Sequence, residues 1–251
     1  MAAALVLLAF LGVWQLYTAI SGLDAFVLPS PIEVVVALAD DRVLLAENFV
    51  VTATEMVVGL LCALVLGVAL TTLLHLSARA RRGLYPLLIG TQVVPIVLVA
   101  PLLVAWFGFG LRPKLLIVAL VCFFPIVVPT LDALQRIDPD RRKLLRTLGA
   151  SRWQTLRFAE APAALPALFT GTRLAVAVAA IAAVLAEYSG SEKGLGRLTL
   201  QSIPQLETAR AYAAIVVLMA FTLALYASLA ALERRLLPWA SPTTPKGHRI
   251  P

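Results

Sequence analysis

The chain has 251 residues, of which 61% are hydrophobic and 14% charged, and its mean hydropathy is +0.92. Soluble domains are about 45–50% apolar and about 25% charged, so this composition excludes an ordinary soluble globular protein and indicates a polytopic membrane protein. The net charge of +7 does not favour nucleic-acid binding, because no soluble segment carries a basic face interleaved with aromatic residues.

Six apolar segments are long enough to be membrane spans, for which about 20 residues are needed. They cover residues 2–20, 49–76, 84–107, 115–131, 166–185 and 211–232. The first segment is interpreted as a retained span rather than a signal peptide, because no basic residue precedes Arg42. The domain organisation predicted from this pattern is a first transmembrane helix (1–20), an external interfacial segment (21–48), a five-helix core (49–237) with a cytoplasmic loop at 134–165, and a disordered cytoplasmic tail (238–251).

The segment between the first two spans contains a predicted short helix. Pro31 is suited to the first helical position, and Ile32, Val35 and Val36 then recur on one helical face. We expect this helix to lie in the outer membrane interface.

Basic residues predict the orientation of the spans. On one side are Arg79, Arg81, Arg82, Arg136, Arg141, Arg142, Lys143, Arg146, Arg152, Arg157, Arg234, Arg235, Lys246 and Arg249. The other side carries only Arg42, Arg112, Lys114, Lys193, Arg197 and Arg210. Cytoplasmic loops are enriched in lysine and arginine, so the first side is predicted to be cytoplasmic, with both termini.

Few polar groups interrupt the spans, and each has two interpretations. Gln92 either lines a translocation path or bonds between helices, and Pro95 and Pro101 either shape that path or are ordinary membrane prolines. Glu187 and Tyr188, at the outer end of the fifth span, either contact a gate or binding protein or mark the interface. Arg173 is expected to snorkel to the cytoplasmic face or to pair with loop carbonyls. Cys62 and Cys122, both in apolar runs, are interpreted as packing residues.

The basic segment, residues 138–160, is the predicted contact for a cytosolic partner. Asp138 is suited to cap a helix that starts at Pro139, and Gly149 permits a tight turn. Two short amphipathic helices meeting there would form an apolar knob ringed by arginines, suited to a groove on another protein. Its apolar members are Leu144, Leu145, Leu148, Trp153 and Leu156.

The chain has no visible energy source of its own. It lacks a G-x-x-x-x-G-K-[ST] phosphate-binding loop, and it lacks G-x-S-x-G and H-E-x-x-H. Apart from Glu55 and Arg173, the predicted spans hold almost no ionisable groups, which argues against a membrane enzyme and against a proton relay. We therefore expect a partner to supply the energy.

The segment "TLGASRWQTLRFAEAPAALPALFTGTRLA" resembles the cytoplasmic EAA loop of ABC-importer permeases. "LPSPIEV", "QVVPIVLVAPLLVAWFGFG", "CFFPIVVPTLDALQRIDP" and "AEYSGSEKGLG" are similar to the same family, in the same order. The nearest branch is the nitrate/sulfonate/taurine type, which includes permeases for thiamine pyrimidine precursors and riboflavin. The chain departs from the family where Lys143, Leu144 and Leu145 replace Glu-Ala-Ala, and where Ala161 replaces a hydrophobic residue.

The resemblance implies an all-α polytopic fold with six transmembrane helices, the type I ABC importer permease fold. It implies a permease homodimer in the bacterial inner membrane, an ABC ATPase dimer and an extracytoplasmic binding protein. ATP and Mg would be held by the ATPase, with no cofactor or metal in this chain. The implied substrate is a vitamin precursor or a nitrate-, sulfonate- or taurine-type anion. The implied ATPase-coupling residues are Leu145, Leu148, Gly149, Ala150, Ser151, Trp153, Leu156 and Pro162. The alternative is a secondary transporter or channel that works without an ATPase.

Overall fold

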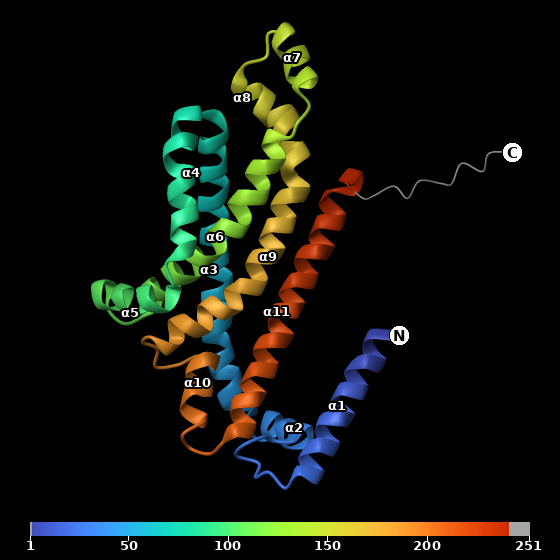
Figure 1. The fold of residues 1–251 in the computed structure, drawn as a ribbon, viewed down its shortest axis with the longest axis vertical. Helices are drawn as coiled ribbons and strands as arrows, with labels where there is room; N and C mark the ends of the chain where they lie inside the picture. The colour runs from blue at the N-terminus through green and yellow to red at the C-terminus, as the bar shows by residue number, and fades with distance from the viewer. Residues whose placement is uncertain (1, 241–251) are drawn as a thin grey trace, which may run out of the picture.

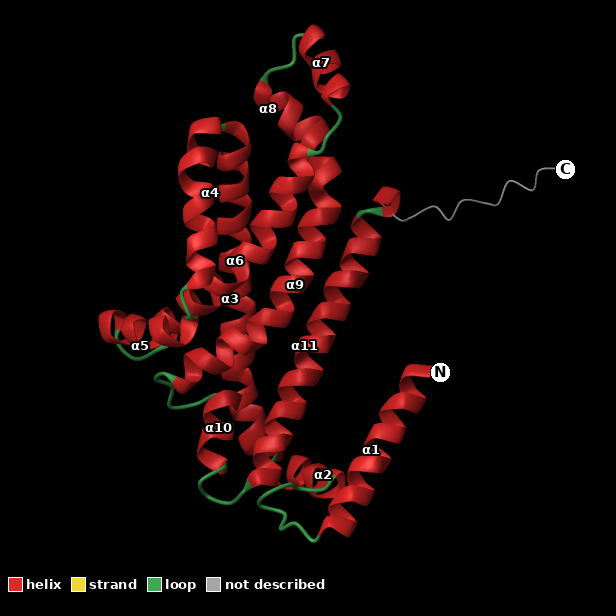
Figure 2. Ribbon diagram, in the orientation of Figure 1, coloured by secondary structure: helices red, strands yellow, loops and turns green. Residues whose placement is uncertain are grey.

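The computed structural model describes residues 2–240, and all regular structure in that range is helical (Figures 1 and 2). Four helices are long and apolar enough to cross a membrane. They are α3 (Arg42–Leu76), α6 (Leu111–Gln135), the continuous helix Arg152–Tyr188 and α11 (Thr208–Leu236). The continuous helix joins α8 (Arg152–Thr155), one π-helical turn (Leu156–Glu160) and α9 (Ala161–Tyr188).

Helices α3, α6 and α9 pack together as the centre of the fold. Met56, Val118 and Ala179 belong to the buried cluster between them. Small residues allow the close approach, as is usual between membrane helices. A Cβ at Gly59 would lie 2.6 Å from the Cβ of Val118, and one at Gly171 would meet the backbone carbonyl of Pro125. The remaining long helix, α11, packs against α9 and α3 at the side of this three-helix centre.

The third predicted span, 84–107, is wrong as a single continuous helix. The structure instead has α4 (Ala78–Val93) and α5 (Ile96–Phe107), which meet at an angle of 100°. The break falls at Val94–Pro95, where Val94 is extended (φ −76°, ψ 118°). Proline lacks an N–H donor and disfavours the helical conformation of the residue before it, which explains the break. The pair is therefore a broken span or a re-entrant element.

The N-terminal helices partly match their predictions. Helix α1 (Ala2–Ser21) is present where the first span was predicted. The predicted short helix is confirmed as α2 (Pro31–Asp40), which begins with a capping box between Ser30 and Glu33. Four long helices and one bent pair are established, so the count of six spans stays a prediction.

The two ends of the bundle differ (Figure 1). One end carries α7 (Pro139–Thr147) and α8, and the other carries α2 and α10 (Leu195–Ser202), a helix that the sequence patterns did not indicate. After α11, Pro238–Ala240 form one 3-10 turn, and the remainder of the predicted tail lies outside the described residues.

Ion pairs attach α11 to the other helices. Near its start, Arg210 binds both carboxylate oxygens of Asp41 (2.7 and 3.0 Å). Near its end, Glu233 pairs with Arg173 of α9 at 3.1 Å, and the Arg173 guanidinium also lies 5.8 Å from the centre of the Tyr226 ring. Arg173 thus pairs with a carboxylate of the neighbouring helix α11 and not with loop carbonyls, so that alternative is wrong, whereas snorkelling of Arg173 to the cytoplasmic face stays a prediction.

Candidate functional site

The basic segment forms a short helix, a turn and the start of a long helix. Helix α7 begins as predicted, with the Asp138 carboxylate accepting from the Asp140 N–H (2.9 Å) and Pro139 in the first turn. Gly149 has φ +81°, a conformation that side chains with a Cβ disfavour. Ser151 then caps α8 through a capping box with Gln154. The second helix is thus the N-terminal end of the 37-residue helix Arg152–Tyr188 rather than a separate element.

Four large apolar side chains of this segment are exposed. The exposed apolar patch consists of Leu144 (61%), Leu148 (75%), Trp153 (57%) and Phe158 (71%). Unlike the exposed apolar side chains of the long helices, these four lie in a segment rich in charged residues, where exposed apolar groups are typical of a contact surface for another protein. Leu145 and Ala150 are half-buried beside the patch, and Pro162 is half-buried in the first turn of α9.

The placement of Leu156 in an exposed knob is wrong. Its side chain is 5% exposed and packs with Leu134 and Ala164. Phe158, which the sequence patterns did not single out, is exposed instead. Both residues lie in the π-helical turn, whose extra residue shifts the helical register away from the 3.6-residue period.

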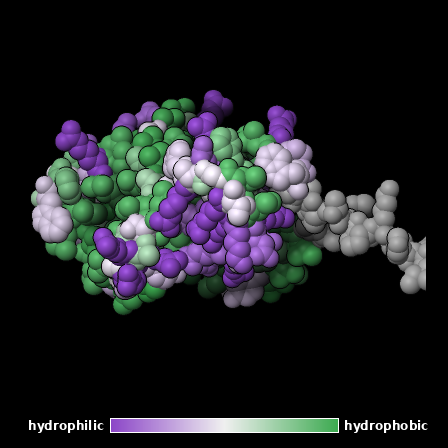
Figure 3. Space-filling model, turned by 90° about the horizontal axis from the view of Figure 1, so that it is seen from above, coloured by the Kyte–Doolittle hydropathy of each residue, from purple (hydrophilic) through white to green (hydrophobic). Residues whose placement is uncertain are grey.

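A buried carboxylate fixes the basic segment to the body of the protein. Glu160, 5% exposed, contacts His75 of α3 (2.7 Å) and Arg142 of α7 (2.6 Å). Arg142 also donates to the backbone carbonyl of Leu134 at 2.5 Å. Lys143 stands where the EAA loops that this segment resembles carry glutamate. Glu160 nevertheless provides this segment with a negatively charged side chain. Figure 3 looks onto this end and shows hydrophilic side chains gathered there between apolar flanks.

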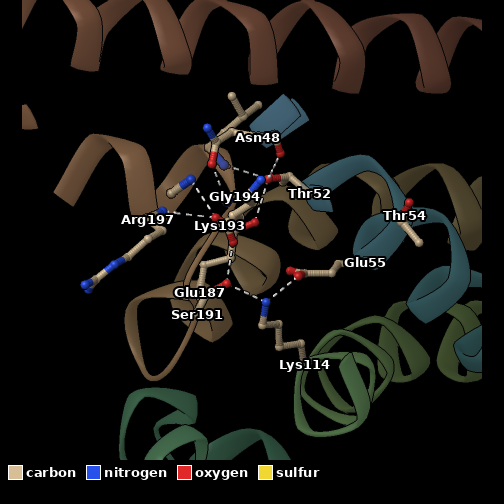
Figure 4. Close-up of polar contacts among 12 residues, drawn as sticks. Asn48, Thr52, Thr54, Glu55, Lys114, Glu187, Ser191, Lys193, Gly194 and Arg197 are labelled. Carbon is tan, nitrogen blue, oxygen red and sulfur yellow. Dashed lines mark hydrogen bonds and ion pairs between the residues drawn. The ribbon is translucent and has the colours of Figure 1, made fainter. Parts of the chain in front are cut away.

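A second group of polar side chains is buried near the opposite end (Figure 4). Lys114 Nζ donates to Glu55 (2.7 Å) and to Ser191 Oγ (2.5 Å), and Ser191 in turn donates to the carbonyl of Lys193. Glu55 is fully buried and Lys114 is 6% exposed. Lys114, which lies just before the fourth predicted span, is therefore buried in the first turn of α6 and paired with Glu55.

Glu187 fixes the start of α10. Its carboxylate accepts from the N–H groups of Gly196 (2.6 Å) and Arg197 (3.1 Å), and from Thr52 Oγ1 (2.5 Å). Helix N-termini carry unpaired N–H groups and a partial positive charge, so a carboxylate satisfies both. Thr52 also accepts from Leu195 N at 2.8 Å, which continues the network into α3 (Figure 4).

The contacts of Lys114 with Ser191 and of Glu187 with Gly196 hold the loop 189–194 and α10 against the three-helix centre. Asn48 Oδ1 accepts from Gly194 N (2.7 Å), which adds another contact from α3. Glu55 Oε2 has no hydrogen-bond partner among the described residues. A cavity of about 390 Å³ lies beside the pair and is lined in part by Glu55, Lys114 and Ser191.

The remaining predicted path residues do not form one cluster. Gln92 and Pro95 line a cavity of about 380 Å³ at the bend between α4 and α5, whereas Pro101 is exposed on α5. Glu187 is fully buried, and Tyr188 beside it is 40% exposed. The role of these five residues in translocation stays a prediction. No group of three His, Cys, Asp or Glu side chains within the described part of the chain is placed to hold a metal ion.

Comparisons with known proteins identify relatives of this chain. Residues 55–238 match the family described as binding-protein-dependent transport system inner membrane component. The formylaminopyrimidine transport permease protein ThiX of Halalkalibacterium halodurans is 32% identical over 228 residues, which are 90% of this chain and 91% of that protein. The riboflavin transport system permease protein RibX of Chloroflexus aurantiacus is 37% identical over 240 residues, covering 93% and 88%. The taurine transport system permease protein TauC of Escherichia coli is 32% identical over 193 residues, covering 77% and 70%.

A solved structure shares the fold. A chain of an amino acid ABC transporter, crystallised with histidines, superimposes with a TM-score of 0.62 over 81% of this chain and 97% of that chain. Its sequence is only 13% identical, so the similarity concerns the fold alone.

Proposed function

Because the chain belongs to the family of binding-protein-dependent transport system inner membrane components, we propose that it forms the translocation path of an ATP-driven importer, moved through residues 138–160. In this family the membrane component has no nucleotide-binding site, and ATP hydrolysis takes place in a separate subunit. The ATPase would contact residues 138–160, and the binding protein would contact the opposite end of the bundle.

The exposed apolar patch is the observation that carries the proposal. Leu148 and Trp153 are more than half exposed at the end of the bundle that carries α7 and α8. Their exposure costs free energy in the isolated chain and favours burial in a groove of a partner. Arg146 and Arg152 flank them and would add charge complementarity to an acidic groove rim.

The route from this patch to the outer end is a single helix. Arg152–Tyr188 begins within the basic segment and ends at Glu187, which holds α10 and the outer loop. An ATPase that displaced α8 would therefore act directly on α9 and on the centre of the bundle. A conformational equilibrium is shifted only by a ligand that binds its two states differently, and an ATPase that changes shape with ATP meets this condition.

The orientation and the other partners complete the proposal. The basic end is cytoplasmic, and both termini lie on that side. A second copy of the chain completes the path, and an extracytoplasmic binding protein delivers substrate to the end that carries α2 and α10. The substrate is a small vitamin precursor or a sulfonate-type anion, which is supported by the ligands in the names of ThiX, RibX and TauC.

The alternative, a secondary transporter or channel, has one observation in its favour. Buried Glu55, Lys114 and Glu187 are the kind of groups that ion-coupled transporters use. However, Glu55 and Lys114 bind each other, and Glu187 is occupied by two backbone N–H groups. Lys114 lies in the first turn of α6, Glu187 in the last turn of α9, and Glu55 is bound to Lys114, so the three do not form a chain across the bundle. The ATP-driven importer therefore remains the better-supported function.

Vesicle reconstitution tests the proposal. Purified chain is placed in liposomes with the cognate binding protein, with and without the ATPase, and uptake of riboflavin, a formylaminopyrimidine and taurine is measured. We expect uptake of one of them only when the ATPase and ATP are present. Uptake by the chain alone would instead establish the secondary transporter or channel.

A matched pair of variants tests the docking surface. Leu148→Asp places a charge in the exposed patch and should abolish ATPase binding. Ile203→Asp places the same charge on an apolar residue at the opposite end that is also more than half exposed (54%), and should leave ATPase binding unchanged. Equal binding by both variants would show that the patch is not the contact.

A further inference from the structure

An arginine-lined cavity of about 610 Å³ lies between the basic segment and the body of the protein. It is bordered by the end of α3, the start of α4, and helices α7 and α8. Its charged and titratable lining consists of His75, Arg81, Arg142, Arg146, Arg152 and Glu160. The arginines come from three separate helices, so the fold, and not a run in the sequence, brings them together.

The positive charge of this cavity is largely uncompensated. Glu160 is the one acidic residue in the lining, and it is already bound by His75 (2.7 Å) and Arg142 (2.6 Å). Within residues 2–240, no acidic side chain lies within ion-pair distance of Arg81, Arg146 or Arg152. Concave surfaces lined by charge of one sign concentrate the potential, so the cavity attracts anions.

The lining is suited to a phosphate group. Guanidinium groups present a planar fork of N–H donors that matches phosphate oxygens in pairs, and three such forks surround one space. The volume lies within the range of small-molecule sites, about 300–1,000 Å³, which exceeds what a single inorganic ion fills.

The position of the cavity indicates where the phosphate comes from. Leu76 and Ala78 also line it, and they mark the junction at which the apolar helix α3 ends and the basic start of α4 begins. Basic pockets at the cytoplasmic ends of membrane helices are suited to the head groups of anionic lipids, whose chains remain beside the apolar helices.

We propose that this cavity binds the phosphate group of an anionic phospholipid of the inner leaflet. Arg81 belongs to α4, whereas Arg146 and Arg152 belong to the basic segment, so the bound phosphate bridges the body and the segment that would meet the ATPase. The lipid thereby restricts the position of α7 and α8. The proposal depends on the proposed function only for the side of the membrane that this end faces.

Lipid titration of the purified full-length chain tests the site. The chain is delipidated in neutral detergent and titrated with phosphatidylglycerol, phosphatidylcholine or inorganic phosphate. Bound lipid is counted by native mass spectrometry, and phosphate binding is measured by calorimetry. The variant R81Q/R146Q is compared with R79Q/R141Q. Each pair removes one arginine from α4 and one from α7, but only the first pair lines the cavity.

We expect at least about tenfold weaker binding of phosphatidylglycerol by R81Q/R146Q, because charge-assisted hydrogen bonds are lost. Affinity of R79Q/R141Q should stay within about twofold of the parent chain, with phosphatidylcholine bound weakly by all three. Binding of inorganic phosphate that depends on Arg81 and Arg146, without binding of phosphatidylglycerol, would support phosphate recognition and overturn the lipid as its source. If R81Q/R146Q does not fold, R152Q replaces it, with a loss of at least about threefold expected.

Two other outcomes overturn the proposal. Equal weakening in both double variants would show a general effect of surface charge. Unchanged phosphatidylglycerol binding, together with loss of ATPase binding in R81Q/R146Q, would assign the cavity to an acidic segment of the protein partner. Lipid binding is measured here without ATPase or ATP, so its failure leaves the proposed transport function standing.

Discussion

Replacing Gly149 by valine should weaken binding of the ATPase without unfolding the membrane core. A Cβ at this position meets no atom within 4 Å, so crowding does not contribute. The effect comes from the backbone, since φ is +81° and a left-handed conformation costs an L-residue about 1–2 kcal/mol, with the larger values for β-branched residues. A cost of about 2 kcal/mol disfavours the native turn about thirtyfold relative to other loop conformations.

The assay is the Kd of the ATPase for the chain held in lipid nanodiscs. We expect a Kd about 10- to 30-fold weaker for Gly149→Val, because much of the loop population no longer presents Leu148 and Trp153 on one surface. Gly149→Asn should stay near the parent value, since asparagine tolerates this conformation. Gly83→Val is the steric control, because Gly83 has equally open surroundings and no left-handed backbone. If Gly149→Val bound the ATPase as tightly as Gly83→Val, the turn would not determine the docking surface.

Three further outcomes are expected. Lys114→Met should destabilise the fold by about 3–5 kcal/mol, because it leaves the Glu55 carboxylate buried without its partner. Adding Glu55→Leu should restore part of this loss of stability, measured by thermal unfolding. Purely additive effects of the two substitutions would contradict the pairing. Glu187→Ala should raise the rate of backbone amide hydrogen exchange at the start of α10 by at least tenfold, since each buried donor left unpaired costs about 1–3 kcal/mol. An unchanged exchange rate in this variant would rule out the capping role of Glu187. A cysteine replacing Ser151 should react only with thiol reagents that reach the cytoplasm, and labelling of intact cells from outside would reverse the proposed orientation.

Local features of the structure followed from the sequence where the controlling residues are neighbours. Asp138 and Pro139 define the start of α7 by themselves, and Pro31 does the same for α2. The turn at Gly149 likewise needs only the backbone freedom of one residue. These rules act over three or four residues, so no knowledge of the tertiary fold was required.

The bend between α4 and α5 could not be located from composition. Pro86, Pro101, Pro125 and Pro129 all lie inside helices, whereas Pro95 alone among these prolines separates two helices at 100°. Each of them removes the same backbone donor. Whether the helix continues depends on whether neighbouring helices pack against both sides of the proline, and the sequence does not give that packing.

The buried network was missed because its members are distant in the chain. Lys114 is 59 residues from Glu55 and 77 residues from Ser191. Lys114 lies only three residues after the start of α6, so counting apolar residues placed it in a loop. One signal was available, since a carboxylate inside an apolar run requires a partner and Glu55 had none assigned.

The uninterrupted helix from Arg152 to Tyr188 has a mechanical consequence. Its 37 residues span about 55 Å at 1.5 Å per residue, which exceeds the roughly 30 Å thickness of the hydrocarbon layer. A rod of this length that pivots near its middle moves its two tips in opposite directions, and a tilt of about 10° displaces each tip by about 5 Å. If the proposed ATPase pulls on the arginine-rich tip, Glu187 and the attached α10 are expected to move in the opposite direction, so one helix would couple the two faces of the membrane.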